Sequence, residues 1–62
     1  MDMILKVFTV VGQSMTVSDA YAMLIGLNPN DPYAKEKAAG SLGGAVNGGT
    51  LELSGNIYTR IK

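Results

Sequence analysis

The side chains that could carry chemistry in this chain are few and scattered. The sequence contains no histidine and no cysteine, which removes the commonest general base and metal ligand, the thiolate nucleophile and the disulfide bond. Its five acidic residues could bind a hard cation, but they lack the spacing of a calcium-binding loop. The sequence also lacks a nucleophile that is paired with a base, and it lacks a phosphate-binding loop. We therefore predict no catalytic residue, no metal site and no cofactor, and we do not expect an enzyme.

The charged residues balance overall but are unevenly distributed. Five basic residues face five acidic residues, so the net charge is zero, which counts against strong non-specific binding to nucleic acid. Residues 1–31 carry one base and three acids, a net charge of −2, whereas residues 32–62 carry four bases and two acids, a net charge of +2. The zero total therefore conceals a modest charge dipole along the chain.

Length and composition predict one small folded domain over residues 1–62. A chain of 62 residues has room for one core, and 47% hydrophobic against 16% charged residues is not the composition of a disordered chain. The longest apolar run, residues 22–27, is far shorter than the roughly 20 residues that cross a bilayer. Asp2 and Lys6 also interrupt the pattern of a secretory signal. We expect a soluble cytoplasmic protein that does not enter a membrane.

Residues 3–11 form the first predicted element, and their signals disagree. The residue types favour a strand, whereas the spacing of the apolar side chains is that of one helical face. We favour a short helix that begins near Asp2 and ends at Gly12, with a strand as the open alternative. A turn should follow, and Met15 should be briefly extended.

A clearer signal starts a second helix at Thr16. The Thr16 hydroxyl can accept a hydrogen bond from the backbone three residues on, where Asp19 can reach back, and this is the arrangement of a capping box. The helix should end at Gly26 or Asn28, because Pro29 disfavours the helical conformation in the residue before it.

A third helix is predicted from Asp31 to about Asn47. Asp31 suits the N-cap, Pro32 suits the first helical position, and Gly48-Gly49 end the helix. On a helical wheel the predicted core face consists of Ala34, Ala38, Leu42, Ala45 and Val46. The opposite face holds Tyr33, Glu36, Lys37, Gly40, Gly44 and Asn47. Each internal glycine costs about 0.5–1 kcal/mol relative to alanine, so this helix depends on tertiary packing.

The tail, residues 50–62, predicts a β-hairpin. Apolar and polar side chains alternate on both sides of a Ser-Gly-Asn turn. A three-residue loop over residues 54–56 would pair Leu53 with Ile57 and Leu51 with Thr59. This register places inside Leu51, Leu53, Ile57 and Ile61, and outside Glu52, Tyr58 and Arg60. A two-residue Gly55-Asn56 turn would scatter the apolar residues over both faces, so the three-residue loop is favoured.

The order of these elements resembles a winged helix-turn-helix domain over nearly all of the chain. A short helix starts at Thr16-Val17-Ser18-Asp19 after a turn, and a longer helix and a hairpin follow. The family's pattern at the end of the longer helix is matched by Leu42, Ala45-Val46, Gly48-Gly49 and Leu51-Glu52-Leu53, and the wing tip by Gly55-Asn56-Ile57-Tyr58. The resemblance implies an α+β, mainly helical fold of about three helices followed by a C-terminal β-hairpin wing. Short domains of this type are similar to small phage, plasmid or archaeal regulators.

DNA binding is what this resemblance implies. In the family the longer helix lies in the major groove and the wing lies beside the backbone, so the 32–47 helix and the 50–62 wing would bind double-stranded DNA in a transcriptional regulator. Lys37 and Arg60 would contact phosphates, and Asn47 a base edge or a phosphate. The DNA-binding residues carried over by position are Tyr33, Lys37, Ser41, Gly44, Asn47, Asn56, Tyr58, Arg60 and Lys62, with Gly40 and Gly55 on the same surfaces.

The helix face expected to meet DNA leaves a second function open. It carries glycines and Glu36 where base-reading residues are typical, and Glu36 would repel phosphate. Gly40 and Gly44 leave a smooth strip that another helix could approach, so a protein-interaction module, an inhibitor or adaptor, is the alternative. A homodimer or another protein partner fits either function, because small cores often gain stability by association.

Each candidate residue also has an interpretation without a ligand. Asn47 can end the helix before the glycines, and Lys37 can pair with nearby acids. The basic residues of the wing can be charges that protect an edge strand from pairing. Tyr33 or Tyr58 can pack its ring on the core with the hydroxyl in water.

Overall fold

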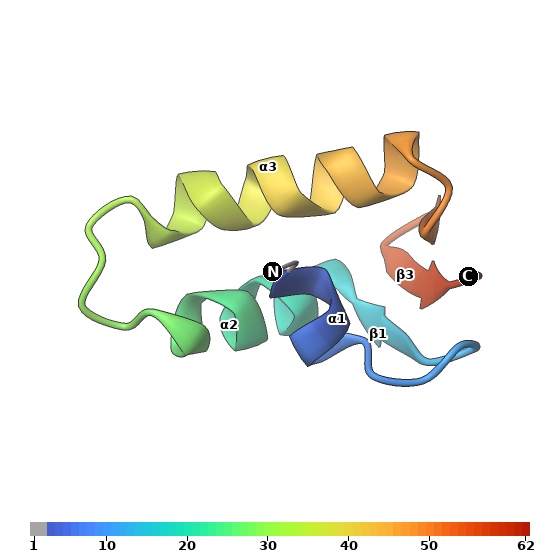
Figure 1. Cartoon of the computed structure of the whole chain (residues 1–62), viewed down its shortest axis with the longest axis horizontal. Helices are drawn as coiled ribbons and strands as arrows, with labels where there is room; N and C mark the ends of the chain where they lie inside the picture. Colours follow the sequence, from blue (N-terminus) through green and yellow to red (C-terminus); the bar gives the residue numbers. More distant parts are fainter. Residues whose placement is uncertain (1–2) are drawn as a thin grey trace.

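Three helices and a three-stranded antiparallel sheet make up residues 3–62, the part of the chain that the computed structural model describes (Figure 1). The helices are α1 (Met3–Val7), α2 (Val17–Leu27) and α3 (Ala34–Asn47), and the strands are β1 (Ser14–Thr16), β2 (Leu51–Ser54) and β3 (Ile57–Arg60). α2 and α3 lie side by side, and α1 packs against both. The fold is α+β with a hairpin after the third helix, a winged-helix-like layout, as predicted.

The first segment is a helix and not a strand, but it ends at Val7, earlier than predicted. The side chain of Gln13 explains the early end. Its Oε1 accepts from the Thr9 N–H at 2.9 Å, and its Nε2 donates to the Val7 carbonyl at 3.0 Å, so it satisfies backbone groups that another helical turn would use. Gly12, at φ +94°, then turns the chain. The predicted cap at Asp2 lies outside the described residues.

α2 has the predicted boundaries. Thr16 is the N-cap, and its Oγ1 accepts from the Asp19 N–H at 3.1 Å, which is the first half of the expected capping box. The helix ends at Asn28, the C-cap, whose N–H donates to the Ile25 carbonyl at 3.1 Å.

α3 begins at Ala34, later than the predicted start at Asp31. The intervening residues form a separate turn, in which the Ala34 N–H donates to the Asp31 carbonyl at 3.2 Å. Asp31 Oδ1 accepts from the Tyr33 N–H at 2.8 Å. Asp31 therefore caps this tight turn and not the helix itself, and Tyr33 occupies the N-cap position without a side-chain hydrogen bond.

The two predicted faces of α3 are both confirmed. The core face is buried at Ala34, Ala38, Leu42 and Ala45 and partly buried at Val46. The predicted opposite face is exposed at Tyr33, Glu36, Lys37, Gly40, Gly44 and Asn47. A periodicity of 3.6 residues thus identifies which side of α3 is available for contact with another molecule.

Met15, predicted to be briefly extended, belongs to a third strand. β1 pairs antiparallel with β3, with Met15 opposite Tyr58. The strand order is β1-β3-β2, so β3 is the central strand. β1 is only three residues long, too short for a period of two to appear in the sequence.

The hairpin has a two-residue loop, so the predicted register is wrong by one residue. Leu53 pairs with Tyr58, and Gly55-Asn56 alone form the turn. Gly55 has φ +61°, as the first position of a type II′ turn requires, and this turn matches the twist of the strands. A shift of one residue exchanges the faces of a strand. In β3, Tyr58, predicted to face solvent, is therefore buried, and Ile61 just after the strand, predicted to lie inside, is 46% exposed. Leu53, also predicted to lie inside, stays on the same face of β2 as the buried Leu51, but it is 44% exposed near the hairpin tip.

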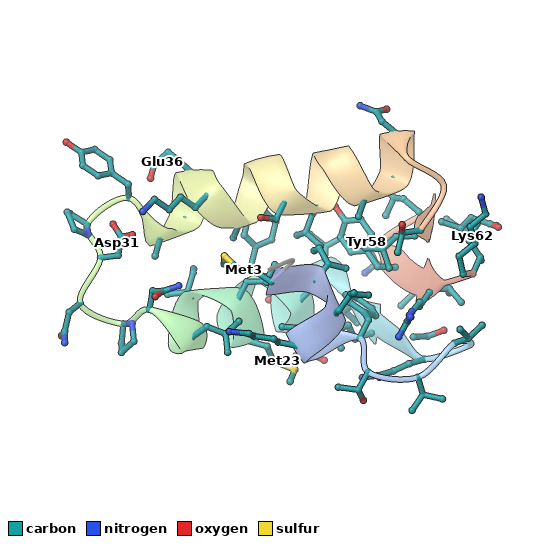
Figure 2. The ribbon with its side chains drawn as sticks, in the orientation of Figure 1. Met3, Met23, Asp31, Glu36, Tyr58 and Lys62 are labelled. Atoms are coloured by element: carbon teal, nitrogen blue, oxygen red, sulfur yellow. The ribbon has the colours of Figure 1, made fainter. Side chains whose placement is uncertain are left out.

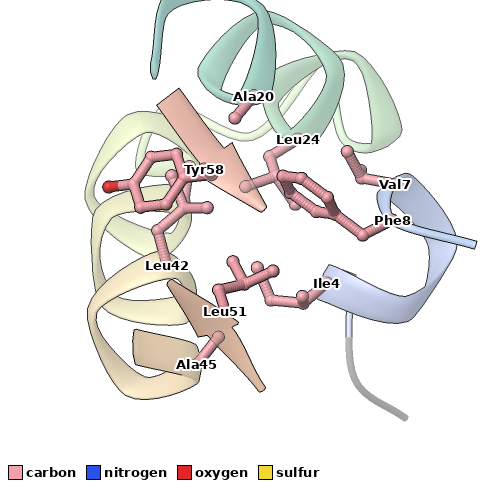
Figure 3. Close-up of a cluster of buried hydrophobic side chains, with 10 residues drawn as sticks. Ile4, Val7, Phe8, Ala20, Leu24, Leu42, Ala45, Leu51 and Tyr58 are labelled. Atoms are coloured by element: carbon pink, nitrogen blue, oxygen red, sulfur yellow. The ribbon is translucent and has the colours of Figure 1, made fainter. Parts of the chain in front are cut away.

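One hydrophobic cluster joins the helices to the hairpin (Figure 3). Phe8 and Leu24 lie fully buried within it, and Leu51 and Tyr58 bring both strands of the hairpin into contact with the helices. Its members are Ile4, Val7, Phe8, Ala20, Leu24, Ala38, Leu42, Ala45, Leu51 and Tyr58. The wing, the β2–β3 hairpin, therefore packs against the helices through apolar side chains.

Candidate nucleic-acid interface

The exposed side of α3 is the surface on which most of the predicted helix residues fall. In Figure 1 this side of the helix points away from α2. We call its central part the outer face of α3, and it consists of Ala39, Gly40, Gly43, Gly44 and Asn47, all of them exposed. Ser41, another predicted contact, is half-buried beside the core face. Glu36, labelled in Figure 2, is exposed near the start of the same helix.

The glycines of the outer face are not required by the fold. A Cβ atom added to Gly40, Gly43 or Gly44 would meet nothing within 4 Å. None of the three has the positive φ that would demand glycine. Alanine would fit at each position and would favour the helix by about 0.5–1 kcal/mol. The outer face is therefore a smooth strip with free space above the helix backbone.

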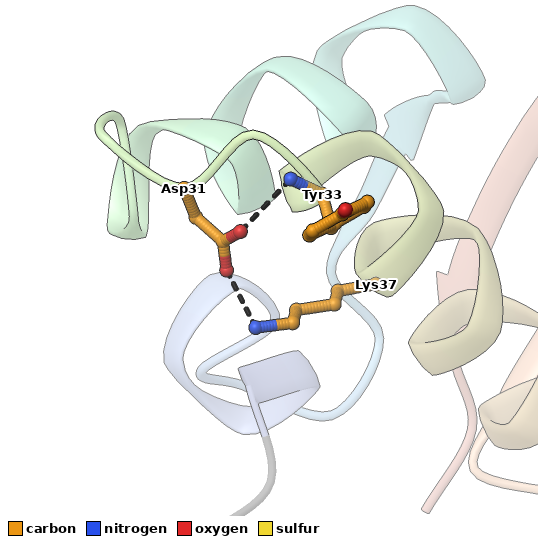
Figure 4. A network of polar contacts seen from close by, with 3 residues as sticks. All are labelled: Asp31, Tyr33 and Lys37. Atoms are coloured by element: carbon orange, nitrogen blue, oxygen red, sulfur yellow. Dashed lines mark hydrogen bonds and ion pairs between the residues drawn. The ribbon is translucent and has the colours of Figure 1, made fainter.

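Lys37 is held within the fold by Asp31. Its Nζ lies 2.5 Å from Asp31 Oδ2, while the other carboxylate oxygen accepts from the Tyr33 N–H (Figure 4). The hydrogen bond from Lys37, and after it that from the Tyr33 backbone, hold the pKa of the Asp31 carboxyl below its usual range. The interpretation of Lys37 as a partner for a nearby acid is confirmed. A phosphate would have to compete with Asp31 for this ammonium group.

Arg60 is also occupied by contacts inside the molecule. Its Nη1 donates to the Phe8 carbonyl at 2.9 Å, and its Nε donates to the Lys62 carbonyl at 2.7 Å. The predicted register placed Arg60 toward solvent, but its side chain is half-buried between β3 and the end of α1. Arg60 therefore satisfies a carbonyl group at the end of α1 and fixes that helix to the sheet. Its phosphate contact stays a prediction.

Two lysines that form no ion pair within residues 3–62 lie toward opposite ends of α3. The Lys62 Nζ lies 3.7 Å from the position that a Cβ atom would take on Gly49, just beyond the C-terminal end of the helix (Figure 2). Lys35 lies in the first turn of the helix and is exposed. Lys35 is not in the predicted set, because a helical wheel places it near the core face. Its position in the first turn is the signal that could have indicated its exposure.

Some of the wing residues predicted to contact DNA lie in the core and others on the surface. Tyr58 packs in the core, and burial, with Tyr21 as a second cause, raises the pKa of its phenol. The interpretation of a ring packed on the core thus holds for Tyr58, whereas Tyr33 is 65% exposed. Asn56 is exposed at the hairpin tip, and its carbonyl accepts from the Val17 N–H at 2.8 Å. The tip is therefore fixed to the first turn of α2.

The structure brings only part of the predicted set together. Gly44 and Asn47 share the outer face of α3, with Lys62 beyond its C-terminal end. Tyr33 and Lys37 lie around the N-terminal end of the helix, beside the Asp31 turn. The remaining wing residues lie elsewhere: the hairpin tip is beside α2, Tyr58 is in the core and Arg60 is against α1.

Comparison of the chain with protein-family models, curated proteins and solved structures gives no match. No helix within residues 3–62 has the length and apolar character needed to span a membrane. The same residues contain no pocket and no cluster of side chains that could hold a metal ion. The winged-helix-like layout and the surface of α3 are therefore the features from which a function can be inferred.

Proposed function

We propose that the protein binds double-stranded DNA with the outer face of α3 and the β2–β3 hairpin, as a small transcriptional regulator of the winged-helix type. The placement of α3 is the observation that supports this most. One side of a 14-residue helix is exposed, while its other side carries the core. α2 packs behind it and the hairpin follows it directly, an arrangement suited to insertion of a helix into the major groove. A phage, plasmid or archaeal regulator of this kind would act in the cytoplasm.

The lysine side chains around α3 determine how strongly the protein should bind DNA. Lys35 and Lys62 are exposed, and Lys37 becomes available when it leaves Asp31. About three phosphate contacts give a slope of about −3 for the logarithm of affinity against the logarithm of salt concentration. A single copy should therefore bind weakly and mainly at low salt. A homodimer that contacts the duplex at two places would bind more tightly, because the second contact becomes intramolecular.

Fluorescence anisotropy with a labelled random-sequence duplex at low salt tests the proposal. We expect binding that weakens as salt is added, because each lysine contact releases counterions. Lys62→Ala and Lys35→Ala should each lower the affinity several-fold. Lys6→Ala removes the same charge from the exposed side of α1 and is the matched control, expected to bind like the parent. Absence of binding at low salt, or an equal loss in all three variants, would contradict the proposed surface.

A protein partner on the outer face of α3 is the second candidate function. The free space at Gly40 and Gly44, which lie one helical turn apart, favours it because another helix could approach the α3 backbone closely there. The protein would then act as an inhibitor or adaptor, for which a net charge of zero is no obstacle.

Sedimentation of the parent and of Gly44→Leu tests this second candidate. The substitution should abolish association with a second copy or a partner while circular dichroism stays helical, because a Cβ atom at Gly44 would meet nothing within 4 Å. Gly26→Leu is the matched control, since Gly26 lies exposed on α2 with the same free space. A parent protein that stays monomeric and captures no partner would exclude this function.

A further inference from the structure

We infer that the duplex is bound without readout of its base sequence. This inference rests on the proposed DNA-binding function and adds the class of substrate, which is B-form DNA of any sequence. The outer face of α3, which the proposal places in the major groove, and the positions of the basic side chains together carry the inference.

A surface that reads bases in the major groove requires side chains with hydrogen-bonding groups. Base edges in the major groove are distinguished by paired hydrogen bonds from arginine or lysine to guanine and from asparagine or glutamine to adenine. On the outer face of α3, Ala39, Gly40, Gly43 and Gly44 carry at most a methyl group and have no such donors. This central stretch of α3 can therefore distinguish bases only by apolar contact.

The arginine, lysine and asparagine side chains that could replace the missing donors are bound elsewhere or lie at the end of the helix. Arg60 is the single arginine of the sequence, and its guanidinium is bound to the Phe8 and Lys62 carbonyls on the sheet side of the molecule. Lys37 is paired with Asp31. Asn47 is the only amide on the outer face, and it is the last residue of α3, whereas recognition helices read bases mainly with their N-terminal residues.

Such a surface can still hold DNA through the phosphates of the backbone. Lys35 is exposed in the first turn of α3 and Lys62 lies just beyond its C-terminal end, and both are free to contact phosphates. The free space above Gly40, Gly43 and Gly44 lets the helix backbone come close to the groove. Contacts of this kind position a protein on the duplex but carry no sequence information.

Selection from a library of random duplexes, followed by competition against a labelled duplex at low salt, tests the inference with the intact protein. We expect no enriched motif, and we expect competitors rich in A·T or in G·C to differ by less than about threefold. One good base contact is worth about tenfold in discrimination. A selected duplex that competes tenfold better than the library would overturn the inference while leaving DNA binding in place. Absence of binding to every duplex would instead show that the proposed function itself fails.

Asn47→Ala provides an independent arm of the same experiment. Because Asn47 supplies the one amide of the outer face, its removal should leave the relative affinities for the competitor duplexes unchanged. Asn30→Ala, in the exposed loop between α2 and α3, is the matched control for loss of an amide. A change in the order of the competitors with Asn47→Ala and not with Asn30→Ala would assign base readout to Asn47 and overturn the inference.

Discussion

Tyr58 packs the wing against the helices, together with Leu51. It belongs to the central strand, is only 7% exposed and packs in the same cluster as Leu42 and Leu51. Its ring is the largest apolar group that the hairpin contributes to the core, so burial of the ring gives the wing a fixed place on the domain. A residue that resemblance assigns to DNA contact thus has a structural task in this fold.

Replacement of Tyr58 should therefore cost much of the stability of the protein. Tyr58→Ala is expected to lower the free energy of unfolding by about 3–5 kcal/mol, a large part of the roughly 3–9 kcal/mol typical of a chain this size. Urea denaturation followed by circular dichroism measures the loss. Tyr33→Ala is the control, because Tyr33 is 65% exposed and should change stability by less than about 0.5 kcal/mol. Equal effects of the two substitutions would contradict the core position of Tyr58.

The raised pKa of Tyr58 predicts a loss of stability at alkaline pH. Burial favours the neutral phenol, so this contribution is complete below the unfolded pKa of about 10 and is lost as the pH rises through the higher folded pKa. Tyr58→Phe keeps the ring in the core and should remove this part of the alkaline loss. Urea midpoints of parent and variant between about pH 8 and pH 11 provide the measurement. Identical pH profiles would show that Tyr58 does not contribute.

At the scale of the elements, α3 contains more glycine than its packing requires. Gly40→Ala and Gly43→Ala should each stabilise the protein by about 0.5–1 kcal/mol, because alanine favours the helix and meets no neighbouring atom. For a chain of this size, the double variant should melt about 5 °C higher or more. Gly55→Ala is the contrasting control and should destabilise, since Gly55 has φ +61°. A double variant that melts lower than the parent would show that the glycines are needed by the fold.

The elements differ in how far the sequence predicts them. Both faces of α3 and both ends of α2 follow from local periodicity and capping, so they could be predicted. The early end of α1 depends on Gln13, which reaches back to Val7 and Thr9, and β1 depends on pairing with β3. Such contacts join segments that only the folded chain brings together. The hairpin register was decided by a II′ turn and the burial of one ring, against the alternation of the apolar side chains.

The candidate site, like the elements, could be predicted from the sequence only in part. The helical wheel predicts that Gly44 and Asn47 are exposed, because exposure along a helix is periodic. It cannot predict that Lys37 pairs with Asp31 or that Arg60 binds the Phe8 carbonyl. These contacts are formed by long side chains whose partners lie across a turn or on another element. The surface was therefore predictable, whereas the availability of its charges was not.

At the scale of the whole molecule, the domain is as compact as a single chain of its size should be. Its accessible surface of 3831 Å² compares with about 3,800 Å² expected for its mass. Its radius of gyration of 10.6 Å compares with about 10.6 Å expected for its length. This compactness favours a core that a single copy completes by itself.

This compactness predicts that folding is independent of protein concentration. The melting temperature should stay constant over a hundredfold range of concentration, because no association is coupled to folding. Thermal denaturation by circular dichroism at several concentrations is the measurement. A melting temperature that rises with concentration would show that the folded state is an obligate oligomer.

The central position of β3 also fixes when the domain can form. β1 pairs only with β3 among the strands of residues 3–62, and β3 is the last of them along the chain. During synthesis all three helices and β1 leave the ribosome before Tyr58 does, so the nascent chain exposes apolar surface until the hairpin emerges. The domain is therefore expected to fold in one step once β3 has emerged, and a product truncated before β3 should be a substrate for proteases.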